Sequence, residues 1–244
     1  MRTWLAAAVV WACATGAFAQ GLNFVPGRPG TTESPIAVPT GHWQIETEIA
    51  SYSDSDGGDS WSALATSFRY GLAPSWDAEA IVAPINHADG DTGFGDLTLR
   101  VRKQFTGLNG ESPSLALIGY VTLPTAEDGL GEDHVEGGVI ATSGITISDR
   151  ASLTLTAGAG SVSDGDDDHL SLSGGAAYSY SFTEATGGYI EIFGEHVDGE
   201  TAATLDIGAT HLIGERTQLD AGVDIGLNRN ADDARFFLGW AHLF

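Results

Sequence analysis

The stretch Phe236-Phe237-Leu238-Gly239-Trp240-Ala241-His242-Leu243-Phe244, at the end of the sequence, decides the fold. Residues two apart lie on the same face of a β-strand. One face therefore carries Phe236, Leu238, Trp240, His242 and Phe244, and the other carries Arg235, Phe237, Gly239, Ala241 and Leu243. A terminal strand that ends in an aromatic residue is typical of outer-membrane barrels, where aromatic side chains mark the boundary between water and lipid. We expect Phe236, Leu238, Trp240 and Phe244 to form the membrane rim and the contact with the barrel-assembly machinery.

The first residues predict a secretory signal peptide over 1–19. Arg2 supplies the positive charge, an apolar run follows, and Ala17-Phe18-Ala19 is a small-x-small cleavage site. Cys13, the single cysteine, lies inside this segment, so we expect no disulfide in the mature chain. No later segment has the roughly 18 consecutive apolar residues of a transmembrane helix.

The chain is strongly acidic. It has 33 Asp and Glu against 10 Lys and Arg, for a formal net charge of −23. This charge excludes a nucleic acid partner bound through its phosphates. Mean hydropathy is near zero, which suits a soluble protein but also a membrane barrel, because lipid-facing and lumen-facing residues alternate and cancel.

Alternating segments of about ten residues, separated by turn residues, recur along the chain, which is the pattern of a transmembrane β-barrel. The clearest sets Leu97, Leu99 and Val101 against Thr98 and Arg100. The expected strands are 41–52, 60–71, 75–85, 95–105, 113–123, 135–147, 151–161, 169–182, 187–197, 201–212, 216–227 and the terminal strand. We therefore predict an all-β fold, with residues 41–244 forming an antiparallel transmembrane barrel of about 12 strands.

The connections support this prediction and give an orientation. Those after odd strands (53–59, 86–93, 124–133, 163–168, 198–200 and 228–233) all contain Asp or Glu, whereas those after even strands are mostly shorter and less acidic. Long outer loops and short periplasmic turns are typical of outer-membrane barrels. We expect acidic extracellular loops and periplasmic termini. A soluble all-β sandwich is the alternative that alternation alone leaves open.

The predicted inner face collects charged residues. We expect the lumen to be lined by Glu46, Glu48, Arg69, Asp77, Glu79, Asp96, Arg100, Arg102, Glu191, Glu195, Asp206, Asp220, Asp224 and Arg235. One interpretation is a polar channel whose negative excess favours cations or neutral solutes. The other is a filled barrel in which arginines pair with carboxylates across strands. Residues 20–40 contain four prolines and cannot form a central strand. They lie either in the periplasm as a tail or in the lumen as a plug.

The sequence also resembles a known family. The stretch RPGTTESP (residues 28–35), then VPTGHWQIE (38–46), TGFGDL (92–97), LAL (115–117) and VTLPT (121–125) are similar to a family of bacterial outer-membrane transporters labelled as proteins of the meta-pathway of phenol degradation. The resemblance covers nearly the whole mature chain. It implies a barrel in the bacterial outer membrane and a role in the uptake of small organic or aromatic molecules, with no catalytic residues to carry over.

Two further signals invite other functions. Asp164, Asp166 and Asp168 form an oxygen-rich loop, but the spacing does not match a calcium-binding hand. They are weak metal-binding candidates, and a solvated loop at the cell surface is the plainer interpretation. Weak bridging by divalent ions to the phosphates of lipopolysaccharide is an intermediate possibility. His169 and Ser171 could suggest a lipid-modifying enzyme, but alternation turns both toward the lumen.

We expect no catalytic residues and no cofactor. The expected function is a channel or transporter for small organic solutes in the outer membrane, in contact with its lipid and lipopolysaccharide. The alternative from another class is a structural or surface-interaction barrel with a filled lumen and cation-binding loops.

Overall fold

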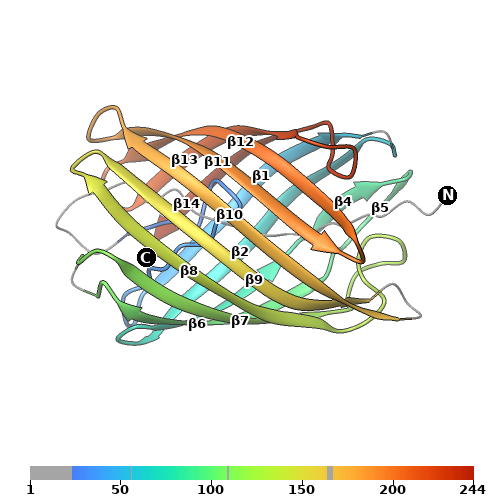
Figure 1. The fold of residues 1–244 in the computed structure, drawn as a ribbon, viewed down its shortest axis with the longest axis horizontal. Helices are drawn as coiled ribbons and strands as arrows, with labels where there is room; N and C mark the ends of the chain where they lie inside the picture. Colours follow the sequence, from blue (N-terminus) through green and yellow to red (C-terminus); the bar gives the residue numbers. More distant parts are fainter. Residues whose placement is uncertain (1–23, 56, 109, 164–166) are drawn as a thin grey trace.

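The chain folds into a closed, antiparallel β-barrel (Figure 1). The computed structural model describes residues 24–55, 57–108, 110–163 and 167–244, so the expected signal peptide lies outside the described residues. The strands are β1 (Trp43–Asp54), β2 (Ser60–Ala73), β3 (Trp76–Val82), β4 (Ile85–Ala88), β5 (Asp91–Gly93), β6 (Leu97–Thr106), β7 (Ser114–Leu123), β8 (Glu136–Ser148), β9 (Ala151–Ser163), β10 (Asp168–Ser181), β11 (Thr186–Val197), β12 (Glu200–Ile213), β13 (Thr217–Gly226) and β14 (Ala234–Leu243). None of the described residues forms a helix long and apolar enough to cross a membrane.

Pairing between β1 and β14 closes the barrel, with Gln44 opposite Leu243 and Asp54 opposite Ala234. Apart from β4 and β5, twelve strands form the wall, as the sequence predicts. The short β4–β5 hairpin was not predicted. It pairs with β2 beyond the end of β3, so it extends the wall within the connection from β3 to β6.

Burial follows the predicted alternation. Along β14 the exposed residues are Phe236, Leu238 and Phe244, just beyond the strand, whereas Phe237, Ala241 and Leu243 are buried. In β6, Leu99 and Val101 are exposed and Arg100 and Arg102 are buried. In a barrel this pattern puts the apolar side chains toward lipid and the charged ones toward the lumen, the reverse of a soluble domain.

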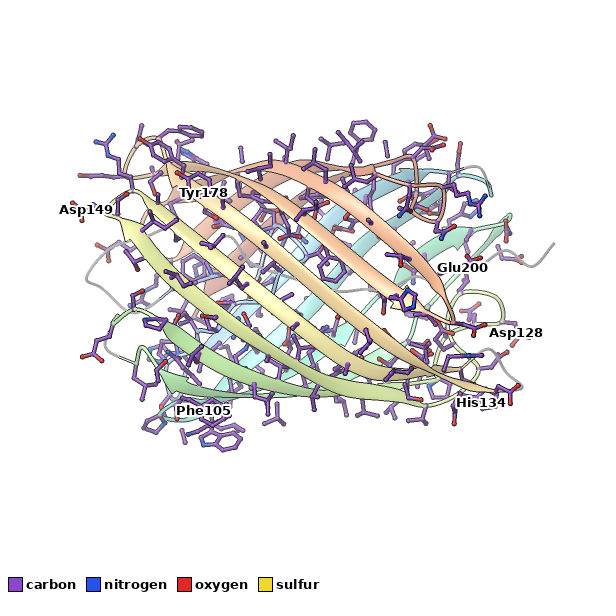
Figure 2. The ribbon with its side chains drawn as sticks, in the orientation of Figure 1. Phe105, Asp128, His134, Asp149, Tyr178 and Glu200 are labelled. Carbon is purple, nitrogen blue, oxygen red and sulfur yellow. The ribbon has the colours of Figure 1, made fainter. Side chains whose placement is uncertain are left out.

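The two ends of the barrel differ. Figure 2 shows Asp149 at one end, and Asp128, His134 and Glu200 at the other. The first, which we call the short-turn end, carries the β2–β3, β8–β9 and β12–β13 turns, and the other, the long-loop end, carries the β7–β8 and β13–β14 loops. Aromatic side chains cluster on the outside of the short-turn end: Trp43 lies 4.8 Å from Tyr70 between ring centroids, and Trp240 stacks on His242, which contacts Phe244. This clustering matches the aromatic girdle of a membrane barrel.

Candidate functional site in the barrel lumen

The N-terminal segment, residues 24–40, lies inside the barrel (the blue coil within the strands of Figure 1). It starts at the short-turn end, where Phe24 packs with Val38, Ala241 and Leu243. It then follows the inner wall, contacting β1, β13 and β14 first, β11 and β12 next, then β8 and β6, and finally β3 and β2. From Phe24 to Val38 every residue is buried or half-buried. The segment therefore fills the lumen at this level.

Two wall glutamates hold this segment by its backbone. The carboxylate of Glu46 accepts hydrogen bonds from the amides of Gly27 (2.7 Å) and Arg28 (2.8 Å). The carboxylate of Glu191 accepts them from Thr31 (2.6 Å) and Thr32 (2.9 Å). A chain without regular structure must satisfy its buried amides with side chains, and charged acceptors give the stronger bonds.

Glycine at positions 27 and 30 permits this close approach. A Cβ atom on Gly27 would lie 2.8 Å from a carboxylate oxygen of Glu46, and one on Gly30 would lie 2.5 Å from an oxygen of Glu191. Further along, the amides of Ala37 and Val38 bind Gln104 and Asp77. The wall therefore contacts the segment along most of its length.

The segment carries one charge of each sign into the lumen, and each is paired. Arg28 binds Asp220 through Nε (3.1 Å) and Nη2 (2.9 Å), with Glu48 3.6 Å from Nη1. Glu33 pairs with Arg100 at 2.7 Å and Arg102 at 3.4 Å. All of these side chains are almost completely buried. Removing one partner of a buried pair typically costs about 3–5 kcal/mol.

The predicted lumen residues lie mostly where the alternation puts them. Ten are buried on the inner wall: Glu46, Glu48, Arg69, Asp77, Glu79, Arg100, Arg102, Glu191, Asp206 and Asp220. Asp224, Glu195 and Arg235 are half-buried on the same side. The wall arginines are paired: Arg69 with Asp77 (2.9 Å) and Glu46 (3.4 Å), and Arg235 with Glu48 (2.5 Å) and Asp224 (2.7 Å).

Asp96 differs from the prediction. It precedes β6 and accepts hydrogen bonds from the amides of Thr125, Ala126 and Glu132, so it fixes the β7–β8 loop rather than lining the lumen. Glu132 lies in this loop near Glu136, Asp96 and Asp133. Partial burial, followed by these negative charges, raises the pKa of Glu132 to about 7.

Inward aromatic side chains lie opposite glycines on the neighbouring strand. Four pairs share this register: Tyr120 with Gly138, Tyr189 with Gly208, Phe193 with Gly175 and Phe237 with Gly222. In each pair a Cβ on the glycine would lie within 3.0 Å of the aromatic side chain. The glycine therefore lets the ring lie close to the wall, which leaves room for the N-terminal segment.

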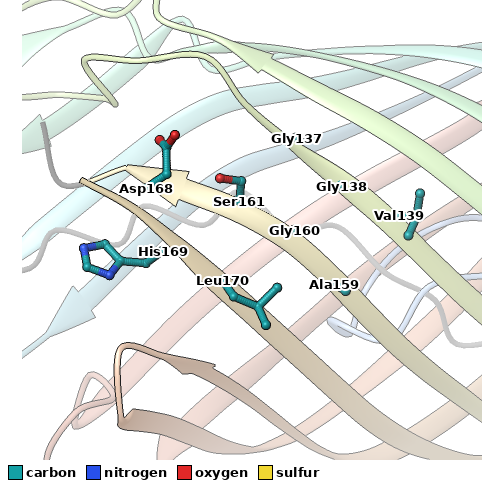
Figure 3. Close-up of a pocket in the computed structure, with 9 residues that line it drawn as sticks. All are labelled: Gly137, Gly138, Val139, Ala159, Gly160, Ser161, Asp168, His169 and Leu170. Carbon is teal, nitrogen blue, oxygen red and sulfur yellow. The ribbon is translucent and has the colours of Figure 1, made fainter. Parts of the chain in front are cut away.

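The enzyme and metal candidates do not come together. Ser171 donates a hydrogen bond to Glu195, whereas His169 lies 3.7 Å from Asp198. Asp164 and Asp166 lie outside the described residues, and Asp168 is exposed at the start of β10. Among the residues that the structure covers, no three His, Cys, Asp or Glu side chains are grouped for a metal ion. A shallow depression beside His169, where β8, β9 and β10 meet, is lined by Val139, Ala159 and Leu170 among others (Figure 3). The exposed side chains of Val139, Ala159 and Leu170 lie on the outer face of the wall, so this depression is separate from the lumen site.

The sequence pointed to the N-terminal segment only through the family resemblance and the choice between tail and plug, and it predicted no wall contact for Gly27, Arg28, Gly30, Thr31, Thr32 or Glu33. The apolar residues of the segment lie at its two ends, in 24–25 and 36–38, and show no alternation. The sequence feature that could have indicated a bound plug is the presence of two glycines and two opposite charges, Arg28 and Glu33, within a proline-rich stretch that cannot form a central strand.

Three solved outer-membrane channels and porins share this fold. The chain resembles the COG4313 outer membrane channel from Pseudomonas putida F1, with a TM-score of 0.65 and 18% identity over 89% of this chain and 99% of that one. It also resembles the NanC porin (TM-score 0.61, 7% identity, 82% and 98% covered) and the KdgM porin (0.54, 11%, 82% and 99%). At these identities the likeness shows the fold of outer-membrane barrels. No curated protein matches the chain by sequence. The model of the family described as "Putative MetA-pathway of phenol degradation" matches residues 26–241, so the chain belongs to that family.

Proposed function

We propose that this protein is a gated outer-membrane channel for small organic molecules, and that the N-terminal segment is its gate. The observation that carries the proposal is the course of residues 24–38 around the inner wall, where wall side chains bind their backbone amides and both of their charges. Apart from the apolar contacts of Phe24 and Val38 with Ala241 and Leu243, the contacts of the segment with the wall that carry this proposal are polar and exchangeable with water. A segment held in this way can leave as a unit when a solute competes for its contacts.

The family description and the channel fold of the neighbours support uptake of small organic, including aromatic, compounds as the direction of transport. The inner aromatic side chains Tyr120, Tyr189, Phe193 and Phe237 support it too, because they offer apolar surface in an otherwise charged lumen. We further propose that the outward side chains of β14 are recognised during barrel assembly, and that the acidic loops at the long-loop end meet lipopolysaccharide.

A disulfide lock tests the gate. The hydroxyl of Thr32 lies 2.8 Å from where a Cβ on Gly175 of β10 would be, close to the separation between Sγ of one cysteine and Cβ of the other in a disulfide. The same Cβ would lie 2.8 Å from Phe193 Cδ2, so every variant in this test also carries Phe193→Ala to make room for it. The Thr32→Cys, Gly175→Cys variant should pass solutes in liposome swelling when reduced and stop passing them when oxidised. The Thr32→Cys single variant is the control and should not respond to oxidant.

The alternative is a structural barrel with a permanently filled lumen. The pairing of the described wall arginines with carboxylates favours it, because such pairs also stabilise a closed interior. It predicts no solute flux from the reduced double-cysteine variant, nor from a variant that lacks residues 24–39. Flux that appears on reduction and vanishes on oxidation would rule it out.

A further inference from the structure

The guanidinium group of Arg28 occupies a pocket that is built around it. Asp220 of β13 binds it through two nitrogen atoms, and Glu48 of β1 approaches the third. The ring of Phe237 on β14 lies 5.7 Å from the guanidinium carbon, within the range of a cation–π contact. The pocket therefore combines a bidentate carboxylate, a second carboxylate and an aromatic face.

Two glycines shape this pocket. A Cβ on Gly239 would collide with the guanidinium group itself, so only glycine at 239 leaves the space that the cation fills. A Cβ on Gly222 would lie 2.5 Å from Phe237 Cζ, so glycine at 222 lets the ring take its position. The space is thus defined by the barrel wall and not by the segment that enters it.

Withdrawal of the segment would affect its two charges differently. If Glu33 leaves, Arg102 still has Asp77 at 3.5 Å and Arg100 has Glu79 at 3.9 Å. If Arg28 leaves, Glu48 keeps its ion pair with Arg235. Among the described residues, the hydrogen bond that remains to Asp220 comes from the side-chain amide of Gln218, at 3.4 Å. A buried carboxylate without a counter-charge is costly, so the vacated pocket attracts a cation.

We propose that Asp220, Glu48 and Phe237 form a binding site for small organic cations with a planar amidinium or guanidinium group, and that Arg28 is its internal ligand while the gate is closed. This inference rests on the proposed function, because an outside cation reaches the pocket only when the segment leaves or when Arg28 is shortened. Such a cation would enter the vacancy and compete with return of the gate. The site makes the channel selective among organic molecules by charge and shape.

Binding to the purified barrel tests the pocket without requiring flux. The Arg28→Ala variant, with Arg28→Gln as a second version in case the first folds poorly, is titrated with benzamidinium by calorimetry. We expect either variant to bind benzamidinium at least about tenfold more tightly than neutral benzamide, the ratio expected for some 1.4 kcal/mol of charge-assisted bonding. Benzoate should not bind.

Two further variants show where the cation sits. Adding Asp220→Asn to the Arg28→Ala chain should weaken benzamidinium binding by about tenfold or more, since the bidentate carboxylate is gone. The Glu33→Gln variant is the matched control, because it removes the other charge of the segment and leaves Arg28 in its pocket. Equal binding to benzamidinium and benzamide, no effect of Asp220→Asn, or the same gain in Glu33→Gln would each overturn the proposal.

The disulfide lock separates the two proposals. If oxidation controls flux but the folded Arg28 variants do not bind benzamidinium, the gate stands and the cation site is wrong. If they bind benzamidinium through Asp220 but no variant passes solute, the site stands and the channel function is wrong.

Discussion

At the scale of single residues, Gly30 shows how closely the wall holds the N-terminal segment. Gly30→Ala would place a methyl group 2.5 Å from a Glu191 oxygen and 3.2 Å from Tyr189 Cε2. Glu191 can move aside only by losing its bonds to the amides of Thr31 and Thr32, at about 1.5–3 kcal/mol for each bond to a charged group. We expect more solute flux and faster proteolysis within residues 31–36.

The control for this change is Gly119→Ala. Gly119 faces outward from β7, and nothing lies within 4 Å of a Cβ added there. Flux and proteolysis of this variant should equal those of the unmodified chain. If Gly30→Ala also leaves solute flux and proteolysis unchanged, Glu191 does not keep the segment in the lumen.

Glu132 gives the β7–β8 loop a dependence on pH. Its pKa is raised to about 7 by burial and by Glu136, Asp96 and Asp133. Because the carboxyl binds its proton more tightly in the folded loop than in the unfolded chain, its stabilising contribution is complete below about pH 4.5 and is lost as the pH rises through 7. A carbon-detected NMR titration of Glu132 should show a midpoint near 7. Glu136→Gln should lower that midpoint, and a midpoint near 4.5 in the unmodified protein would contradict the assignment.

At the scale of elements, the inner wall depends on aromatic residues lying opposite glycines. On β13, Gly222→Ala would put a methyl group 2.5 Å from Phe237 Cζ and 2.9 Å from the Ile207 carbonyl oxygen. Overpacking of this kind costs about 1–3 kcal/mol, and we expect that loss in urea unfolding from lipid vesicles. Gly174→Ala on the outer face, where the nearest atom is 3.6 Å away, should leave unfolding unchanged. Equal effects from both substitutions would mean that the ring does not need the glycine.

The same elements show what alternation can predict. It places Leu99 outside and Arg100 inside because the side-chain period of a strand is independent of its partners. Alternation does not predict that Tyr189 lies opposite Gly208 or that Arg69 forms its ion pair with Asp77, because both depend on the register between strands. The β4–β5 hairpin was missed because Ile85–Ala88 has only four residues, too few to show a period.

The N-terminal segment lies beyond local prediction for another reason. Its conformation is set by contacts such as that of Thr32 with Glu191, 159 positions away. Proline content excludes a central strand but does not distinguish a plug from a tail. The glycines at 27 and 30 favour a plug because they let the backbone approach Glu46 and Glu191, and this contact is known only once the barrel has formed.

At the scale of the whole molecule, the inner wall carries more negative than positive charge. Among the predicted lumen residues that line the wall, nine carboxylates (Glu46, Glu48, Asp77, Glu79, Glu191, Glu195, Asp206, Asp220 and Asp224) face four arginines (Arg69, Arg100, Arg102 and Arg235). The segment adds one charge of each sign and leaves this excess unchanged. The arginines on β2 and β6 have acidic partners nearby, whereas β12 and β13 contribute Asp206, Asp220 and Asp224 and no inward arginine. Of these three, Asp224 pairs with Arg235 of β14, and Asp220 loses its arginine when the segment leaves. An opened lumen therefore has an acidic wall on one side.

This asymmetry predicts cation selectivity in a barrel freed of its gate. A variant without residues 24–39 should show a reversal potential of the cation-selective sign in a salt gradient across a planar bilayer, because an acidic lumen concentrates cations. Adding Asp206→Asn, Asp220→Asn and Asp224→Asn leaves six of these wall carboxylates against four arginines and should roughly halve that potential or more. Asp89→Asn, Asp91→Asn and Asp128→Asn, which remove the same charge at the long-loop end, are the matched control and should shift it less, since exposed charges are screened by salt. A larger shift from the loop variant would place the selectivity at the mouth and not at the acidic wall.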